Sequence, residues 1–494
     1  MIFNSVEFIL FFPICVTIYY ILPYKWRNVF LLIASYYFYM CWIPHYALLL
    51  FFSTIVTYLS SIAIERSEKR IGRLVILVIS LLLNLGVLFY FKYYNFFIDT
   101  LMSIIPSLEL QHTSWLLPVG ISFYTFQTLG YTIDVYRQKI SGRGIVPERN
   151  FITYALFVSF FPQLVAGPIE RSNNLLPQFH EKHTFSIDGA VSGLQLILVG
   201  LFKKIVIADM IAMFVDEVYS DYDIYGGLVI CLAILLFTIQ IYCDFSGYSD
   251  IARGAARIMG FKLMLNFNAP YLSASVKEFW NRWHISLSTW FKDYIYIPLG
   301  GCKKGFARKL CNLMIIFVIS GLWHGAARAF ILWGILHGTY RIVDEIFNKY
   351  FSNIVKRIPE IIRIAGTFIL VSMTWNFFRA ESIHQAIYIF KHCLENVNLD
   401  VFIENYVNIV NSIFPSGYNF TVIYAVIILT SCLGLFILDC FQKYRNTRIE
   451  ETITKLPGIV RWAVYYGMII AIMFSFIMTT NEYGQAGAFI YFQF

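Results

Sequence analysis

The stretch Cys311-Asn-Leu-Met-Ile-Ile-Phe-Val-Ile-Ser-Gly-Leu-Trp-His-Gly325 decides the class of fold, because it is apolar almost throughout and yet ends on a histidine. The thirteen residues before His324 carry no formal charge. A titratable imidazole at such a place costs free energy unless a partner or a water-filled cavity receives it. An ionisable side chain at membrane depth is therefore a functional-site hypothesis by default. Thirteen residues further on, His337 recurs in a similar apolar frame.

Two glycine pairs offer a structural explanation for the same region. Gly321-x-x-x-Gly325 and Gly334-x-x-x-Gly338 have the spacing of close helix-packing faces, and a histidine beside each pair could bond across a helical bundle. This explanation covers the glycines well, but it does not account for two histidines. We therefore predict a chemical role for His324, with His337 as the next candidate.

The composition of the whole chain agrees with a membrane protein. Of its 494 residues 58% are hydrophobic and 14% are charged, whereas about 25% charged is usual in a soluble domain. Aromatic residues make up 18%, more than interfacial belts require, which suggests an aromatic-lined interior as well. The net charge of +8 does not indicate nucleic-acid binding, because most Lys and Arg residues lie in loops between apolar runs. We predict an all-α, polytopic transmembrane bundle that lies in the bilayer of the cell membrane.

The loop charges predict the orientation of the chain. Loops at 23–28, 65–73 and 136–150 are basic, whereas those at 42–45, 99–114 and 221–227 contain no Lys or Arg. Basic loops face the cytoplasm, so the N-terminus is expected outside.

Apolar runs approaching the roughly 20 residues of a membrane span recur along nearly the whole chain. We expect about twelve crossings within a single integral membrane domain that covers residues 1–494. Runs that Gly and Pro interrupt, at 151–169 and 310–335, are expected to be re-entrant or to line a cavity. The spans are expected near 6–22, 29–41, 46–64, 74–98, 115–135, 187–219, 228–243, 310–322, 330–345, 361–380, 418–439 and 462–480.

The largest interruption of the apolar pattern is 244–309, which holds ten Lys and Arg residues and is expected to face the cytoplasm. Within it, Trp280, His284 and Leu287 follow the i, i+4, i+7 spacing of one helical face. An amphipathic helix lying in the membrane interface, anchored by tryptophans, is one interpretation. The other is that His284, beside a basic and aromatic surface, meets an anionic donor arriving from the cytoplasm.

Several long motifs resemble the membrane-bound O-acyltransferases, and most of all the bacterial branch that acetylates alginate and related envelope polysaccharides. The resemblance spans nearly the whole chain. The motifs are Pro118-Val-Gly-Ile-Ser-Phe-Tyr-Thr-Phe-Gln127, Phe161-Pro-Gln-Leu-Val-Ala-Gly-Pro-Ile-Glu-Arg171, Asp244-Phe-Ser-Gly-Tyr-Ser-Asp-Ile-Ala-Arg-Gly254, Asn266-Phe-Asn-Ala-Pro-Tyr271, Asn281-Arg-Trp-His-Ile-Ser-Leu-Ser-Thr-Trp290, Tyr296-Ile-Pro-Leu-Gly-Gly301, Leu322-Trp-His-Gly325 and Phe489-Ile-Tyr-Phe-Gln-Phe494.

The resemblance implies that His324, the histidine of the Trp-His-Gly motif, is the catalytic residue. It also implies an acetyl donor such as acetyl-CoA and a separate secreted or membrane-anchored acetyltransferase that often receives the acetyl group. Relatives that transfer D-alanyl groups to teichoic acids are similar but shorter. Length and the C-terminal motif favour the acetyl branch, and D-alanyl transfer to teichoic acid stays open as an alternative function. The substrate or donor channel is expected to involve Asn281, Arg282, Trp283, His284, Trp323 and His337.

The chemistry of O-acyl transfer agrees with this assignment. A hydroxyl must lose its proton as it attacks the acyl carbonyl, and a neutral histidine can accept that proton near neutral pH. We expect neither a metal nor a bound cofactor. His180-Glu-Lys-His183 lies in a polar loop without the further ligands that a structural zinc site needs, and no Gly-x-Ser-x-Gly, Walker or Rossmann pattern occurs.

Two classes of function fit a polytopic, aromatic-rich chain. One is an enzyme that moves an acetyl group from a cytoplasmic donor toward an extracellular or periplasmic polysaccharide such as alginate, along a path from the cytoplasmic His284 to His324 on the outer side. The other is a polysaccharide transporter or flippase, whose site usually lies between repeated halves. Because we find no repeated halves, and because polar residues concentrate in one segment, we favour the enzyme.

Overall fold

Helices make up the regular secondary structure of the residues that the computed structural model describes, which are 1–165, 167–395, 397–414, 420–445, 447–483 and 489. The predicted all-α fold is therefore confirmed. Within these ranges, seven helical segments are long and apolar enough to cross a membrane. They are Pro44–Arg66, Arg70–Ile104, Gly227–Ile258, Phe306–His324, Glu360–Arg379, Phe420–Arg445 and Gly458–Thr479. Two shorter apolar helical segments are Val6–Ile21 and Phe151–Leu164, and the count of about twelve crossings stays a prediction.

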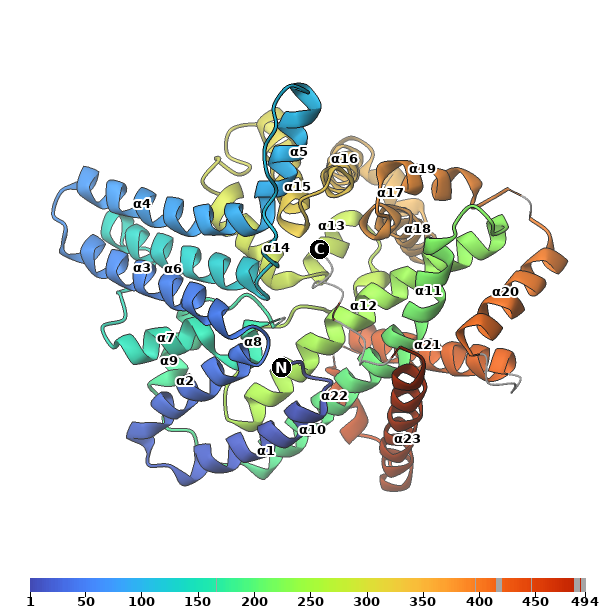
Figure 1. The fold of residues 1–494 in the computed structure, drawn as a ribbon, viewed down its shortest axis with the longest axis horizontal. Helices are drawn as coiled ribbons and strands as arrows, with labels where there is room; N and C mark the ends of the chain where they lie inside the picture. The colour runs from blue at the N-terminus through green and yellow to red at the C-terminus, as the bar shows by residue number, and fades with distance from the viewer. Residues whose placement is uncertain (166, 396, 415–419, 446, 484–488, 490–494) are drawn as a thin grey trace. The chain divides into compact units, whose positions relative to one another are not determined.

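The first of two compact units comprises residues 1–197, 251–265 and 292–294. Its centre is a set of three helices, α3, α4 and α6, that pack against one another (Figure 1). Polar side chains join them, as where the Ser53 hydroxyl donates to the Asn84 side chain at 2.6 Å. The helices of this unit are α1 (Val6–Ile21), α2 (Tyr24–Met40), α3 (Ala47–Arg66), α4 (Arg70–Leu88), α5 (Tyr94–Ile104), α6 (Ile121–Ser141), α7 (Phe151–Ser159), α8 (Phe161–Leu164), α9 (Ser172–Phe179) and most of α10 (Ile187–Leu201).

The second unit comprises residues 198–250, 266–291 and 295–494, and it contains His284, His324 and His337. Its most extensive helix pair is α15 (Phe306–His324) with α16 (Arg328–Tyr350). The π-helix η3 (Phe202–Asp209) contacts α23 and α21. The other elements are α11 (Met210–Ser220), most of α12 (Gly227–Ile258), η4 (Pro270–Leu272), α13 (Val276–Arg282), α14 (Ile285–Phe291), α17 (Ser352–Arg357), α18 (Glu360–Arg379), α19 (Ile383–His392), α20 (Leu399–Ile413), α21 (Phe420–Arg445), α22 (Ile449–Thr454) and α23 (Gly458–Tyr483).

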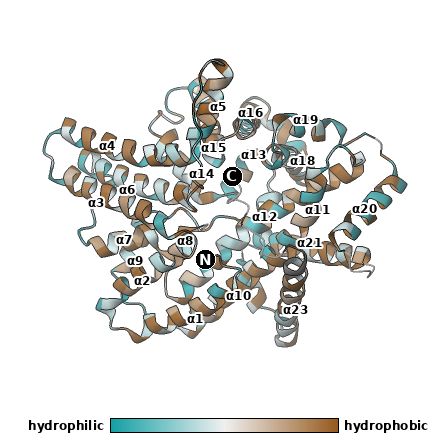
Figure 2. Ribbon diagram, in the orientation of Figure 1, coloured by the Kyte–Doolittle hydropathy of each residue, from teal (hydrophilic) through white to brown (hydrophobic). Residues whose placement is uncertain are grey.

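Long helices expose large apolar side chains, as membrane spans must. Hydrophobic residues predominate along α4 (Figure 2), where Leu82 is 64% exposed. On α21 and α23, Leu429 and Ile470 are 68% and 67% exposed. Isolated apolar side chains are common on soluble surfaces, but continuous exposed apolar faces mark contact with lipid or another protein. These faces agree with a bilayer around the helices.

Several predicted boundaries differ from the structure. The span expected at 115–135 is α6, which covers Ile121–Ser141. The span expected to end at 243 continues as α12 to Ile258, so the first quarter of the segment 244–309 is helical. The span expected at 187–219 is divided into α10, the π-helix η3 and α11. By contrast, the predicted interruptions are present, since α7 ends at Ser159 and α15 ends at His324.

The predicted orientation can be tested by labelling single cysteines. The three exposed native cysteines, Cys41, Cys302 and Cys311, would first be changed to serine. A cysteine introduced at Ser67, which follows α3, should then react with a membrane-impermeant maleimide only from the cytoplasmic side. One introduced at Thr113 should react only from outside, because the loop 99–114 contains no Lys or Arg. Labelling of both from the same side would refute the orientation.

Candidate active site

His324 is the last residue of α15, and glycines set the place of that helix against α16. A β-carbon on Gly321 would lie 2.2 Å from the carbonyl oxygen of Phe330, and one on Gly334 would lie 2.3 Å from that of Phe317. Only glycine permits so close an approach of two backbones. The glycines therefore serve the helix packing, as the structural explanation predicted. They also bring the end of α15 against α16, which carries His337.

Aromatic rings enclose the imidazole of His324. Its ring centroid lies 4.9 Å from that of Trp333, 5.0 Å from Trp323 and 5.2 Å from Phe378, each in an edge-to-face arrangement. Only 3% of the residue is exposed. Edge-to-face packing orients a ring as well as burying it. The predicted aromatic interior is thus present around the predicted catalytic histidine.

Two tryptophans connect the three candidate histidines. The Trp323 ring lies 5.0 Å from His324 and 5.8 Å from His284. The Trp333 ring lies 4.9 Å from His324 and 4.8 Å from His337. We call these five residues the histidine–tryptophan cluster. Residues that stand up to 53 positions apart in the chain, from His284 to His337, thus meet in one buried place.

Buried polar atoms in and beside this cluster have hydrogen-bonding capacity to spare. Among the described residues, neither ring nitrogen of His337 has a hydrogen-bond partner, and the indole nitrogens of Trp280 and Trp333 have none. All three residues are buried, and Trp280 lies 5.1 Å from His337. Because buried polar groups are nearly always bonded, such atoms call for an explanation. They can bond a polar guest such as an acyl carbonyl or a water molecule.

The backbone at His284 differs from the prediction. The expected helical face through Trp280, His284 and Leu287 is wrong, because α13 ends at Arg282 and α14 begins at Ile285. His284 lies in the break with φ of +42°, a left-handed conformation that is uncommon outside glycine. Asn266 holds this break, since its carbonyl accepts from the Ile285 amide at 2.9 Å.

Asn266 is a positioning residue that the sequence did not reveal. Its side-chain oxygen accepts from the Ser286 amide at 3.3 Å, and its side-chain nitrogen donates to the Ser249 hydroxyl at 3.1 Å. It thereby ties the turn at His284 to α12. The motif that contains Asn266 was recognised, but nothing in the sequence indicates which residue the amide would contact.

The interfacial interpretation of this segment is wrong, because its tryptophans are buried. Trp283 and His284 have no exposed surface, and Trp280 and Trp290 are 8% and 5% exposed. His284 therefore lies on no surface, basic or otherwise, and its ring packs 4.6 Å from Phe245. Burial lowers the pKa of His284 to about 3, which keeps the imidazole neutral at physiological pH. A neutral imidazole can form a hydrogen bond with the acyl donor, but it carries no positive charge that would attract an anionic donor.

Two predicted channel residues stand apart from the histidine–tryptophan cluster. Asn281 is exposed. Arg282 donates to Glu278 at 2.9 Å and to the carbonyl of Asn268 at 3.0 Å, which fixes the end of α13. Trp283 belongs near the cluster, because Trp375 lies 4.9 Å from it and 5.8 Å from Trp333.

The pair His180 and His183, considered as a metal motif, is bonded within the first unit. His180 contacts Glu148 at 2.6 Å, and His183 bonds the carbonyl of Gln178 at 2.8 Å. The two imidazoles are therefore directed to different partners.

A buried charge network lies on η3, where hydropathy alone predicts a continuous apolar span. On η3, Lys204 contacts Asp209 at 2.8 Å and Asp244 at 2.7 Å, and Lys203 contacts Asp250 at 2.8 Å. The signal was present, since the rule that singled out His324 applies equally to two lysines inside an apolar run. A π-helix is also frequent at functional sites. The network joins η3 to α12, the helix that Asn266 ties to the turn at His284.

Other residues of the motifs that resemble the family make contacts inside one unit or the other. In the first unit, Glu170 is 2% exposed and accepts from the Met264 amide at 2.5 Å, while burial raises its pKa to about 7. In the second unit, Phe489 packs 4.4 Å from Tyr248. Ala166 and residues 490–494 of the recognised motifs lie outside the described residues.

Comparisons with known proteins agree with these observations. The model of the membrane-bound O-acyltransferase family matches residues 122–380, which include the whole histidine–tryptophan cluster. A probable alginate O-acetylase of Pseudomonas aeruginosa is 40% identical over 78% of this chain and 73% of its own length. A peptidoglycan O-acetyltransferase of Helicobacter pylori is 31% identical over 100% of this chain and 98% of its own. A teichoic acid D-alanyltransferase of Bacillus subtilis is 28% identical over 54% of this chain and 69% of its own.

Proposed function

Because the chain belongs to the membrane-bound O-acyltransferase family, we propose that it moves an acetyl group from a cytoplasmic donor across the cell membrane for O-acetylation of a polysaccharide outside the cytoplasm. The chain is a multi-pass membrane acyltransferase. The acetyl donor, the direction of transfer and the acceptor are what we propose. Two acetyl-transferring relatives support it, one of which aligns along the whole chain. The D-alanyl-transferring relative aligns with about half of it, which favours acetyl transfer. The relatives reported above are all transferases, which favours an enzyme over a transporter.

The observation that carries the proposal is the enclosure of His324 among Trp323, Trp333 and Phe378, with the His284 ring 5.8 Å from the same Trp323. Acyl transfer needs a base that is shielded from bulk water, because water would otherwise compete with the acceptor hydroxyl for the acyl group. His324 stands at the end of a candidate membrane span whose other end, near Phe306, adjoins the basic segment. A donor and an acceptor approaching from opposite sides can meet there.

In the proposed reaction, an acceptor hydroxyl attacks the carbonyl carbon of an acetyl thioester such as acetyl-CoA. His324 accepts the hydroxyl proton as the new C–O bond forms. The C–S bond then breaks, and the departing thiolate takes the proton from His324. The side-chain nitrogens of His337, Trp280 and Trp333, which have no hydrogen-bond partner among the described residues, are suited to bonding the carbonyl oxygen, whose negative charge grows during the attack.

The acceptor is proposed to be a polysaccharide such as alginate, or a secreted or membrane-anchored acetyltransferase that passes the group on. Inside-out membrane vesicles supplied with acetyl-CoA labelled in the acetyl group test the direction and the donor. We expect label to reach acid-stable, alkali-labile esters in the vesicle lumen. Label that stays in the outer medium, or transfer of D-alanine in place of acetate, would refute the proposal.

For donor use, we expect His284→Asn to reduce acetyl transfer strongly. Asn tolerates the left-handed backbone of this position better than Ala, so the variant removes the imidazole with little added strain. The measurement is the transfer rate from labelled acetyl-CoA in vesicles that contain equal amounts of protein. Trp290→Phe is a matched control, because Trp290 is buried in the same segment but outside the histidine–tryptophan cluster. Normal transfer by His284→Asn would exclude a role of His284 in donor use.

A further inference from the structure

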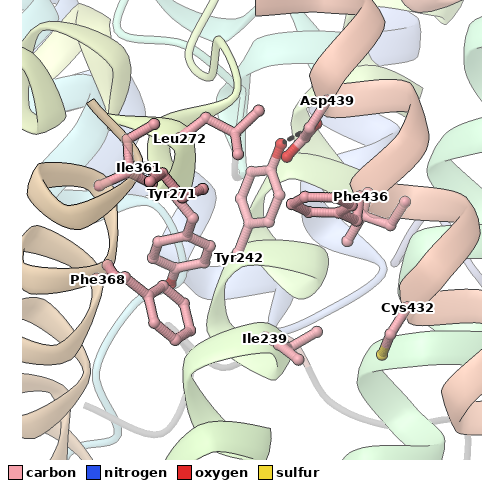
Figure 3. Close-up of a pocket in the computed structure, with 12 residues that line it drawn as sticks. Ile239, Tyr242, Tyr271, Leu272, Ile361, Phe368, Cys432, Phe436 and Asp439 are labelled. Atoms are coloured by element: carbon pink, nitrogen blue, oxygen red, sulfur yellow. Dashed lines mark hydrogen bonds between the residues drawn. The ribbon is translucent and has the colours of Figure 1, made fainter. Parts of the chain in front are cut away.

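A cavity of about 310 Å³ lies in the second unit between α12, η4, α18 and α21 (Figure 3). This volume is at the lower end of the range for small-molecule sites. Apart from Tyr242, Tyr271 and Asp439, the side chains around it are apolar or weakly polar. The Tyr242 hydroxyl points to Asp439 and donates to it at 3.0 Å, so this polar group is already bonded (Figure 3). The lining residues are Ile239, Tyr242, Tyr271, Leu272, Ile361, Ile364, Ala365, Phe368, Cys432, Leu435, Phe436 and Asp439.

The helices that line the cavity indicate its position along the membrane normal. The helices α12, α18 and α21 are all candidate membrane spans. On α18 the lining residues fall in the first half, and on α21 they run from its midpoint, Cys432, toward its C-terminal end. Glu360 is the acidic residue in the first turn of α18, and basic residues flank both of these helix ends. Lys356 and Arg357 precede α18, and Arg445 ends α21. By the positive-inside rule, the cavity lies at the level of the cytoplasmic leaflet.

Cationic groups gather beside the cavity. Lys443, on α21, donates to the carbonyl of Leu272 at 2.8 Å and to Glu360 at 2.5 Å. Arg363 stands next to the lining residue Ile364, and among the described residues its buried Nε has no hydrogen-bond partner. The Glu360 carboxylate interacts electrostatically with both Lys443 and Arg363, so two cations share one anion here. Asp439 also lines the cavity, but the cation that interacts with it electrostatically is Lys203. Lys443 and Arg363 therefore outnumber Glu360 beside the cavity, which suits a phosphate.

We propose that this cavity binds an acyl chain of an anionic phospholipid from the cytoplasmic leaflet, with the phosphate held by Arg363 and Lys443. At this depth lipid is the abundant apolar molecule, and the exposed Ala365 and Ile361 leave the cavity open on the bilayer side. A polar donor such as a thioester with its amide-containing arm would find few partners in the lining. The site is separate from the proposed acetyl transfer.

The energetics of such a site determine which changes should matter. An acyl chain leaves one apolar environment for another, so the hydrophobic effect contributes little. Binding must come from close packing in the cavity and from the pairing of the phosphate with cations. Filling the cavity and removing the cations should therefore each reduce binding, and removing the cations should also reduce the preference for anionic lipid.

The cavity is tested with a phosphatidylglycerol that carries a diazirine near the end of one acyl chain. After irradiation of the purified full-length protein in mixed micelles, the crosslinked residues are mapped by mass spectrometry. In the wild type we expect crosslinks at Cys432, Phe436 or Phe368. Cys432→Trp should lose most of them, whereas Leu433→Trp should keep them, because Leu433 is the next residue on α21 and is 58% exposed.

A second pair of variants guards against misfolding of Cys432→Trp. Ala365→Phe fills the cavity from α18, and Ile362→Phe changes a neighbouring residue that is 58% exposed and outside the lining. All four variants are compared by gel filtration. If a cavity-filling variant folds properly and crosslinks as much lipid as its control variant, the lipid belongs only to the layer that surrounds the protein. That result would overturn the proposal.

The phosphate contact is tested with Arg363→Gln and Lys443→Gln. The wild type should crosslink the phosphatidylglycerol probe in preference to a phosphatidylcholine probe with the same acyl chains, and both variants should lose that preference. Equal labelling of the wild type by the two probes would refute the proposed preference for an anionic headgroup. Because these measurements detect bound lipid, their failure would leave the proposed acetyl transfer untouched.

Discussion

Cells in which His324→Gln replaces the wild-type protein should lose nearly all acetyl transfer, by a factor of about 10²–10⁴ in rate. Glutamine roughly preserves the size and polarity of histidine and can keep one hydrogen bond, but it cannot accept a proton at neutral pH. Glutamine can occupy the place of the imidazole between Trp333 and Phe378, because the two side chains are similar in size. We therefore expect the variant to fold. A structural histidine and a catalytic base therefore give different results with this substitution.

The measurement is the O-acetyl content of the cell-surface polysaccharide, at membrane levels of the variant equal to the wild type. His112→Gln serves as a matched control, because His112 is an exposed histidine that pairs with Asp99. Near-normal acetylation by His324→Gln would refute the catalytic assignment. His337, whose ring lies 4.8 Å from Trp333, would then be the residue to change next.

The second large effect is expected for Lys204→Met, which should lower the stability of the protein by about 3–5 kcal/mol. Lys204 is 1% exposed and contacts two carboxylates, Asp209 and Asp244. Its removal would leave two buried acidic groups close together without the cation that both contact. The penalty comes from these uncompensated charges more than from the lost attraction, since buried ion pairs themselves contribute little net stability.

Thermal unfolding of the purified protein in detergent measures this effect. Lys262→Met is the control, because Lys262 is exposed. Neutralising both acids together with the lysine, in Lys204→Met with Asp209→Asn and Asp244→Asn, should recover much of the lost stability. If the triple variant is no more stable than Lys204→Met, the uncompensated-charge explanation is wrong.

The difference between the predicted and observed end of α12 has the same physical origin. Hydropathy counts Asp244 and Asp250 as breaks in an apolar run, so the span was expected to end at 243. In the structure, Lys204 and Lys203 pair with these carboxylates, and the helix continues to Ile258. A charge is compatible with a buried helix when its partner is near, and the partner here stands about forty residues away in the chain.

At His284, too, a local sequence pattern fails to predict the structure, here the conformation of the backbone. Its spacing from Trp280 and Leu287 predicts one continuous helix, because local periodicity is all that a sequence displays. Asn266 instead binds the Ile285 and Ser286 amides and holds a break at His284. The tertiary contact overrides the local pattern, and it turns the imidazole from an expected surface toward Trp323.

By itself the sequence determined the all-helical membrane fold and predicted interruptions within 151–169 and 310–335. It also indicated His324 as the residue of chemical interest. These follow from transfer free energies, which depend on composition over a window of about 20 residues. Only the tertiary structure decided that His284, His324 and His337 meet around Trp323 and Trp333, that two lysines are buried with three aspartates, and that α18 and α21 leave a cavity between them. Such features depend on which side chains pack across helices, and a window along one chain does not contain that information.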